Sequence, residues 1–410
     1  MSRLQEMDHW GRVIQSLEAL AGDTAAPAEV SAGAVARLEA DILTACATGA
    51  ACPADRLLAC AFRLVDGPAS GTAPASRARM ALASARMLAR CGHAAAASAV
   101  LERLATMAKG ERLARVELVA LMELADLYRR QGKLAEAEVV YDSAGERAAR
   151  EGHLREHADA LNGRATVLLE GGHVARADAL LRHALEIAVE IDDARLTGHI
   201  YNNLGVLCCI RGDYAAGACE LARALAARQS VGNAGAFAET YHNLGLAARR
   251  RQRPDEAREH LRRASEYARM SGDGRLAGNV FLAETELDLD SGDLRLARFH
   301  AERALAIHRE HGDALGIAEA RRFTGLVAHL QGDANEACRI LEEALAAFEK
   351  VGHLLGIAET AEDLAHVART LGDRERAQAL LAQAAAIFGE LGDTRRAASA
   401  AAQAASPGCA

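Results

Sequence analysis

The sequence predicts an all-α fold, a right-handed superhelical solenoid of about eight to nine antiparallel helix pairs. A glycine-centred turn returns every 40 residues along most of the chain, as at Gly132, Gly172 and Gly212. A second turn series lies half a period away, with glycine at 152, 232, 272, 312, 352 and 392 and aspartate at 192. The composition agrees, because half of the residues are apolar, only 3% are aromatic, and much of the apolar content is Ala and Leu. Both are strong helix formers.

Residues 1–79 fit this period less well and are expected to form an N-terminal unit. A cap helix is expected over Met1–Leu20, and a degenerate helix pair over Val30–Ala47 and Ala54–Leu64 with a turn at Cys52-Pro53. The Gly/Pro-rich segment Asp66–Ala75 predicts a loop.

Residues 80–392 are predicted to form the repeat array. In one unit Leu161, Ala165 and Leu168 lie at i, i+4 and i+7, on one face of a first helix. Gly171-Gly172 ends that helix. A second helix then carries Ala177, Leu181, Ala184 and Leu185 at the same kind of spacing.

The residues after the turn predict how each second helix begins. An aspartate follows the turn glycine in four units (Asp213, Asp293, Asp333 and Asp373), where its carboxylate can accept hydrogen bonds from free N–H groups of the second helix. One unit has Arg251-Gln252-Arg253 in place of the glycine turn, and Pro254 follows at the expected first helical position. Proline is compatible with that position, so the exception supports the pattern.

Three columns of small residues recur at 40-residue steps and mark where helices come closest. Each column is represented by one unit here, at Ala177, Ala184 and Gly205. After the array, Asp393–Ala405 predicts a polar-faced capping helix and Ser406–Ala410 a tail, which together make a C-terminal unit of residues 393–410.

These small columns, together with the words Asn202–Gly205 (NNLG), His242–Gly245 (HNLG) and the G-D-x-x-x-A of Gly292–Ala297, resemble the tetratricopeptide repeat. The unit of 40 residues is longer than the usual 34 of that family. It resembles the long-repeat branch found in kinesin light chains, polarity adaptors and the sensor regions of bacterial regulators. The resemblance covers about residues 80–400 and implies the fold, with no chemistry of its own.

Composition and motifs argue against several functional classes. A net charge of −8 gives no footprint for nucleic-acid binding. No glycine loop ends in Lys-Ser/Thr, so no phosphate-binding loop is expected, and no cofactor is predicted. The start of the chain lacks a signal-peptide pattern, no apolar run could span a bilayer, and the nine cysteines lack paired spacing. We therefore expect a cytoplasmic protein with reduced thiols and no membrane insertion.

Histidines and acidic residues invite a metal or catalytic interpretation that their positions do not favour. Four of the fifteen histidines (His93, His153, His173 and His353) occupy turn positions, and His308 and His311 straddle a helix end without a third ligand. Glu284, Glu286, Asp288 and Asp290 are two residues apart on one first helix, which scatters them over both sides. No metal site and no enzyme activity are predicted.

The repeat around Gln252 carries an arginine cluster at 249, 250, 251, 253, 262 and 263, next to the acidic first helix. Two interpretations are open. In one, the opposite charges form ion pairs between neighbouring units. In the other, they divide a groove into a basic and an acidic part that orients a ligand.

Candidate binding residues follow from projecting the first helices away from their buried stripe, onto the concave wall of the superhelix. Side-chain amides there can bond both N–H and C=O of an extended peptide. The candidate residues for a ligand or partner protein are His199, Asn202, Asn203, Glu239, His242, Asn243, Arg249, Arg250, Asn279, Glu286 and Arg322.

The sequence thus favours a non-catalytic scaffold or adaptor that takes a peptide or helix of a partner protein into its groove. The alternative is a stand-alone regulatory sensor, in which a small peptide or metabolite changes the superhelical pitch.

Overall fold

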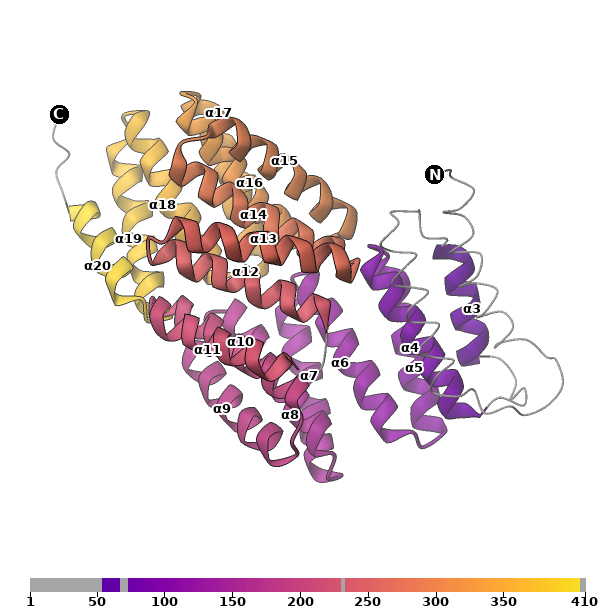
Figure 1. Cartoon of the computed structure of the whole chain (residues 1–410). Helices are drawn as coiled ribbons and strands as arrows, with labels where there is room; N and C mark the ends of the chain where they lie inside the picture. Colours follow the sequence, from indigo (N-terminus) through magenta and orange to yellow (C-terminus); the bar gives the residue numbers. More distant parts are fainter. Residues whose placement is uncertain (1–53, 67–72, 230–232, 406–410) are drawn as a thin grey trace.

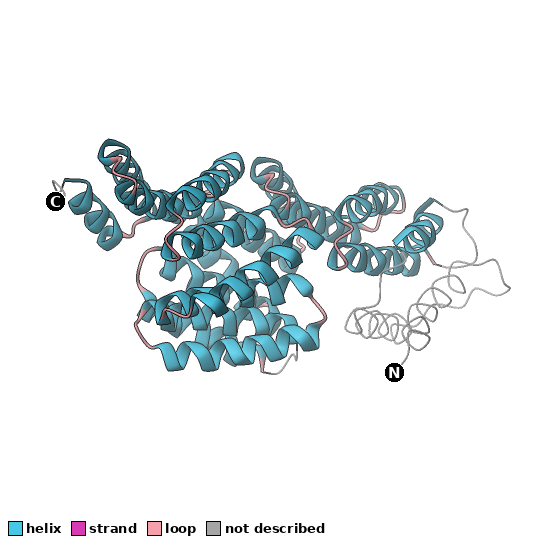
Figure 2. Ribbon diagram, turned by 90° about the horizontal axis from the view of Figure 1, so that it is seen from above, coloured by secondary structure: helices cyan, strands magenta, loops and turns pink. Residues whose placement is uncertain are grey.

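The computed structural model describes residues 54–66, 73–229 and 233–405. Four segments with sequence-based predictions lie outside the described residues, namely Met1–Leu20, Val30–Ala47, Cys52-Pro53 and Ser406–Ala410. All secondary structure in the described part is helical (Figure 2). The helices are α3 (Ala54–Asp66), α4 (Pro74–Arg90), α5 (Ala94–Gly110), α6 (Ala114–Arg130), α7 (Leu134–Arg150), α8 (Leu154–Glu170), α9 (Val174–Glu190), α10 (Ala194–Ile210), α11 (Tyr214–Arg228), α12 (Ala234–Arg250), α13 (Pro254–Ser271), α14 (Gly274–Ser291), α15 (Leu294–His311), α16 (Ala314–Leu330), α17 (Ala334–Val351), α18 (Leu354–Thr370), α19 (Arg374–Leu391) and α20 (Thr394–Ala405).

The helices form eight antiparallel pairs within these residues, which confirms the predicted all-α solenoid. Each pair has a first helix with an even label, from α4 to α18, and a second helix with an odd label, from α5 to α19. α3 precedes the first pair and α20 follows the last (Figure 1). First helices of successive pairs also contact each other, so they form one continuous row along the array.

The turn residues begin and end the helices as the sequence predicts. Each predicted capping aspartate accepts a hydrogen bond from the backbone N–H three residues later, at the start of a second helix. These residues are Asp213, Asp293, Asp333 and Asp373. The glycine before each aspartate has a φ between +78° and +92°. Left-handed backbone of this kind costs other residues about 1–2 kcal/mol, so glycine suits the position.

The unit without a turn glycine keeps the same backbone turn. Gln252 has a φ of +59°, in the left-handed region, and Pro254 lies in the first turn of α13. The replacement of glycine therefore strains the backbone locally without changing the path of the chain.

Small residues allow the two helices of a pair to pack closely. A Cβ atom added to Gly205 of α10 would lie 2.6 Å from Cγ of Leu221 and 3.1 Å from the carbonyl oxygen of Gly217, both in α11. Gly245 and Leu261 have the same separation along the sequence as Gly205 and Leu221, and so do Gly325 and Leu341. A Cβ atom added to either glycine would lie 2.7 Å from the side chain of its leucine. The buried core is therefore built from leucines that pack onto small residues of the partner helix.

Turns far apart in the sequence also touch each other. A side chain at Gly172 would collide with Leu354, and a Cβ atom at Gly212 would lie 2.9 Å from the carboxylate of Asp393. One buried apolar cluster contains residues of both α8–α10 and α16–α20. Units about five pairs apart in the chain are therefore in contact, which stabilises the pitch of the superhelix.

Candidate functional site

The candidate residues lie on four consecutive first helices, α10, α12, α14 and α16. Their exposure differs. Three of them are buried, namely Asn202, Glu286 and Arg322. The others are half-buried, namely His199, Asn203, Glu239, His242, Asn243, Arg249, Arg250 and Asn279. The half-buried members keep part of their surface open to solvent, although Nδ1 of His242 is buried.

Asparagine side chains link neighbouring first helices. The amide nitrogen of Asn203 donates hydrogen bonds to the side-chain oxygens of Asn162 (2.9 Å) and Thr166 (3.1 Å) on α8. The amide nitrogen of Asn243 donates to the side-chain oxygen of Asn202 (3.3 Å), which is 1% exposed. The amides are therefore used partly for contacts between repeats, and Asn202 has the least surface left for a ligand.

Two histidines of this region are held in their neutral form. Burial and the neighbouring Arg228 together lower the pKa of His199 to about 4, although Glu239 opposes the shift. Burial likewise lowers the pKa of His242 to about 4. Neutral imidazoles at pH 7 offer one donor and one acceptor each, which suits hydrogen bonding to a peptide backbone.

Arg228, at the end of α11, belongs to the same cluster and is not among the residues predicted from the sequence. Its side chain is 2% exposed, and one guanidinium nitrogen lies 3.2 Å from Nδ1 of His199. The sequence alone could have indicated it, because Arg228 occupies a position that is alanine 40 residues before and after it, at Ala188 and Ala268 of the neighbouring second helices.

A ladder of alternating charges continues along the first helices toward the C-terminus. It consists of Arg249, Glu286, Arg322, Glu359 and Arg396, which lie on α12, α14, α16, α18 and α20. The closest nitrogen–oxygen distances along it are 2.6, 3.8, 3.1 and 2.8 Å. This charge ladder connects the first helices of four consecutive pairs with α20.

Additional charges surround the ladder. Arg250 lies 2.8 Å from Glu359, and Arg322 lies 3.1 Å from Asp363. Burial would raise the pKa of Glu359, but Arg322, Arg396 and Arg250 outweigh it and hold that pKa well below its usual range. Glu319 has less compensation, because burial raises its pKa to about 7 and Arg322 opposes the shift only in part.

The arginine cluster around Gln252 forms ion pairs both between units and within one helix. Arg249 pairs with Glu286 and Asp290 of the next unit, which confirms ion pairing between neighbouring units. Arg262 and Arg263 instead pair with Glu259 of their own helix α13. The acidic residues of α14 point to both sides of that helix. Glu286 and Asp290 face Arg249 of α12, whereas Asp288 lies 2.7 Å from His300 of α15.

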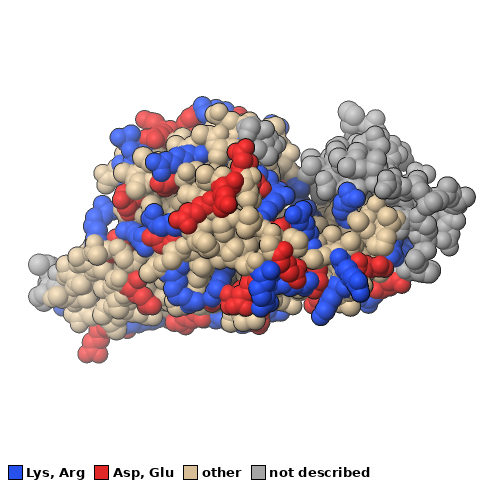
Figure 3. Space-filling view, turned by 90° about the horizontal axis from the view of Figure 1, so that it is seen from below, with Lys and Arg blue, Asp and Glu red and all other residues tan. Residues whose placement is uncertain are grey.

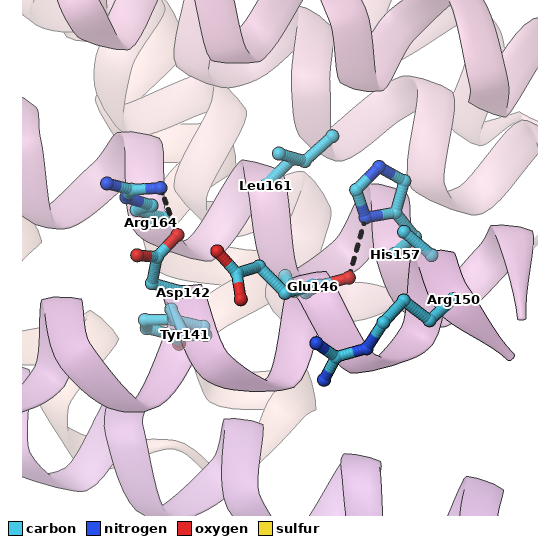
Figure 4. Close-up of a pocket in the computed structure, with 10 residues that line it drawn as sticks. Tyr141, Asp142, Glu146, Arg150, His157, Leu161 and Arg164 are labelled. Carbon is cyan, nitrogen blue, oxygen red and sulfur yellow. Dashed lines mark hydrogen bonds and ion pairs between the residues drawn. The ribbon is translucent and has the colours of Figure 1, made fainter.

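A pocket of about 440 Å³ opens elsewhere, between α7 and α8 (Figure 4). Tyr141, Ala149, Ala160 and Leu161 contribute its apolar surface, with charged side chains around them. Gly145 widens it, because this position is leucine in four other second helices (Leu185, Leu225, Leu305 and Leu345). None of the predicted site residues lines it.

Other classes of site find no support in the residues that the structure describes. No group of three or more His, Cys, Asp or Glu side chains there could hold a metal ion. Every helix in those ranges is too short or too polar to cross a membrane. On the face shown in Figure 3, basic and acidic side chains are interspersed rather than gathered into patches of one sign.

Comparison with known proteins agrees with this architecture. Residues 236–310 and 316–390 match the tetratricopeptide repeat family model. A Rap protein complexed with competence and sporulation factor is 16% identical over 95% of this chain and 98% of its own, with a TM-score of 0.63. The Rap conjugation gene regulator of the plasmid pLS20, in complex with the Phr* peptide, is 13% identical over 85% and 95%, with a TM-score of 0.55. The apo form of RapI is 13% identical over 67% and 98%, with a TM-score of 0.50. No curated protein matches the chain.

Proposed function

Because this chain is a tetratricopeptide repeat protein, we propose that it is a non-catalytic binding protein that holds a peptide segment or helix of a partner along its first helices. The observation that carries the proposal is the run of half-buried polar side chains on α10, α12 and α14. It consists of His199, Asn203, His242, Asn243 and Asn279. Amides and neutral imidazoles can bond the N–H and C=O groups of an extended chain.

The solved structures support the same class of ligand. Two of the chains with the Rap fold are complexes, one with competence and sporulation factor and one with the Phr* peptide. Their fold covers most of this chain, so a solenoid of this shape can hold a peptide. The peptide that this chain would bind is set by its own side chains.

A second candidate function is a sensor whose superhelix changes when ligand binds. The observation that favours it is the contact between distant turns, for example at Gly172 and Leu354. A ligand that favours a different pitch would have to break or strengthen these contacts, and the change would reach both ends of the array.

Affinity selection tests the binding proposal. The full chain is immobilised and exposed to a library of short random peptides, and the retained peptides are identified by mass spectrometry. Retention of a defined subset is expected, and the paired changes Asn243→Ala and Asn279→Ala should reduce it about tenfold through lost hydrogen bonds. Arg223→Gln, at a side chain 62% exposed on α11, is the matched control. If wild type retains no peptide, the proposal is wrong.

Small-angle scattering then separates the two candidates. The radius of gyration of the full chain is measured alone and saturated with the peptide that is retained most strongly. A scaffold should keep its radius of gyration, whereas a sensor should change it. An unchanged value with full occupancy excludes the sensor.

A further inference from the structure

Arg228 brings a permanent charge into the packed interior of the array. The equivalent position of the other second helices is alanine at 108, 148, 188 and 268, histidine at 308 and phenylalanine at 348 and 388, and each of these residues is at most 3% exposed. Arg228 is itself 2% exposed. Arginine is almost never buried to this degree without a paired anion, so its place in this column needs a reason.

Gly198 makes room for the arginine. A Cβ atom added to Gly198 of α10 would lie 2.7 Å from Cγ of Arg228. The units on either side have Ala158 and Ala238 at the equivalent position of the first helix. The two residues therefore fit one another, and the side chain of Arg228 reaches from α11 between α10 and α12.

The partners of the guanidinium are mostly neutral. It donates hydrogen bonds to the backbone carbonyl of Ala236 and to the hydroxyl of Thr240. Its other terminal nitrogen lies 3.2 Å from Nδ1 of His199, and Nε has no hydrogen-bond partner. Neutral acceptors solvate an arginine without balancing its charge.

Glu239 supplies the one carboxylate that is recorded within 4.0 Å of Arg228 in the described residues, and it does so at the limit of that range. The Glu239 side chain is 44% exposed, so it can rotate away without unpacking the core. Burial lowers the pKa of Arg228, which agrees with a charge that lacks full compensation. A carboxylate in direct contact would provide the missing charge and a short, charge-assisted hydrogen bond.

We propose that Arg228 and His199 form a subsite for a carboxylate of the bound peptide, and that Glu239 occupies this place in the free protein. The inference rests on the proposed function and extends it by assigning the chemical class of one ligand group. The carboxylate comes either from the C-terminus of the peptide or from an Asp or Glu side chain. Both sources present the same planar anion, which matches the fork of a guanidinium.

The test repeats the affinity selection with three peptide libraries. The first has free C-termini and all residue types, the second is amidated at the C-terminus, and the third has free C-termini without Asp and Glu. If the ligand group is the C-terminus, wild type should retain the third library and lose retention of the second by about tenfold. If it is a side chain, the pattern reverses.

Three variants complete the experiment, each with its melting temperature measured. Arg228→Gln should reduce retention of carboxylate peptides about tenfold, whereas the exposed Arg223→Gln should not change it. Glu239→Gln removes the competing carboxylate and should increase retention. This variant leaves the core intact, so it decides the matter even if Arg228→Gln does not fold.

The outcomes are distinguishable from one another. Peptides retained equally from all three libraries, or unaffected retention in Arg228→Gln, would overturn the carboxylate subsite and leave the proposed function standing. Reduced retention in Glu239→Gln would also overturn it, because Glu239 would then contact the ligand favourably. Failure of wild type to retain any peptide overturns the proposed function and the subsite together.

Discussion

Arg322 of α16 lies 3.1 Å from Glu359 of α18, and the two residues join the first helices of consecutive repeats. Arg322 also lies 3.1 Å from Asp363 and 3.8 Å from Glu286. One buried guanidinium therefore serves three carboxylates on the helices before and after its own. Glu359 is its counterpart in the charge ladder, because it contacts Arg250, Arg322 and Arg396.

Replacing Arg322 by methionine should destabilise the array strongly. The apolar side chain fills a similar volume but leaves Glu359 and Asp363 buried without their main cation. Loss of one partner from a buried pair costs about 3–5 kcal/mol. Urea unfolding followed by circular dichroism measures the effect. Arg339→Met, at a side chain 57% exposed on α17, is the control and should change stability by less than about 0.5 kcal/mol. Equal effects of the two variants would show that the ladder is not stabilising.

Replacing Gly205 by leucine should disrupt the local helix pair. The added side chain would meet Leu221 and the backbone of Gly217, and overpacking of this kind costs about 1–3 kcal/mol. Gly389→Leu is the matched control, because nothing lies within 4 Å of a Cβ atom there. Calorimetry should show a lower melting temperature for Gly205→Leu and no decrease for Gly389→Leu. A fully stable Gly205→Leu protein contradicts the close packing of α10 on α11.

Replacing Gln252 by glycine should stabilise the protein. Gln252 has a left-handed φ of +59°, which costs a residue with a Cβ atom about 1–2 kcal/mol. Part of the gain is offset by the greater freedom of glycine in the unfolded chain, so a net gain of about 0.5–1 kcal/mol is expected. Gly332→Gln makes the reverse change at a turn with φ of +92° and open space around it. The two variants should shift the urea midpoint in opposite directions, and a shift of the same sign would refute the strain argument.

Glu319 should make the stability depend on pH. Its pKa in the folded protein is raised from 4.5 to about 7, so the folded state binds this proton more tightly than the unfolded state. The resulting stability is present below the unfolded pKa and is lost as the pH rises through about 7. Glu319→Gln should therefore raise the melting temperature at about pH 8 and change it little at about pH 5. Glu302→Gln, at an exposed position of α15, is the control. If the difference in melting temperature between Glu319→Gln and wild type did not depend on pH, the raised pKa of Glu319 would be contradicted.

The repeat period predicted most of the fold because it fixes local features. Helix ends, the aspartate caps and the close contact at Gly205 each depend on residues within one unit. The contact between Gly172 and Leu354 could not be predicted in this way. It depends on small rotations between units that add up over about five pairs, and no single residue determines them.

The candidate site was predictable as a region but not in its detail. Helical projection selects Asn202 and Asn203 together, yet one is buried and the other half-buried, because adjacent residues of a helix point about 100° apart. Arg228 escaped notice since it lies on a second helix and reaches the first helices only through the space at Gly198. A comparison of each column for residues of unusual size or charge would have found it.

We propose that the ligand lies along the first helices. The most direct test is photo-crosslinking of the full chain to the most strongly retained peptide, synthesised with a benzophenone side chain at each position in turn. We expect crosslinks to residues of α10, α12 and α14, mapped by mass spectrometry and suppressed by excess unlabelled peptide. Suppressible crosslinks confined to second helices, or to the pocket between α7 and α8, would contradict the claim.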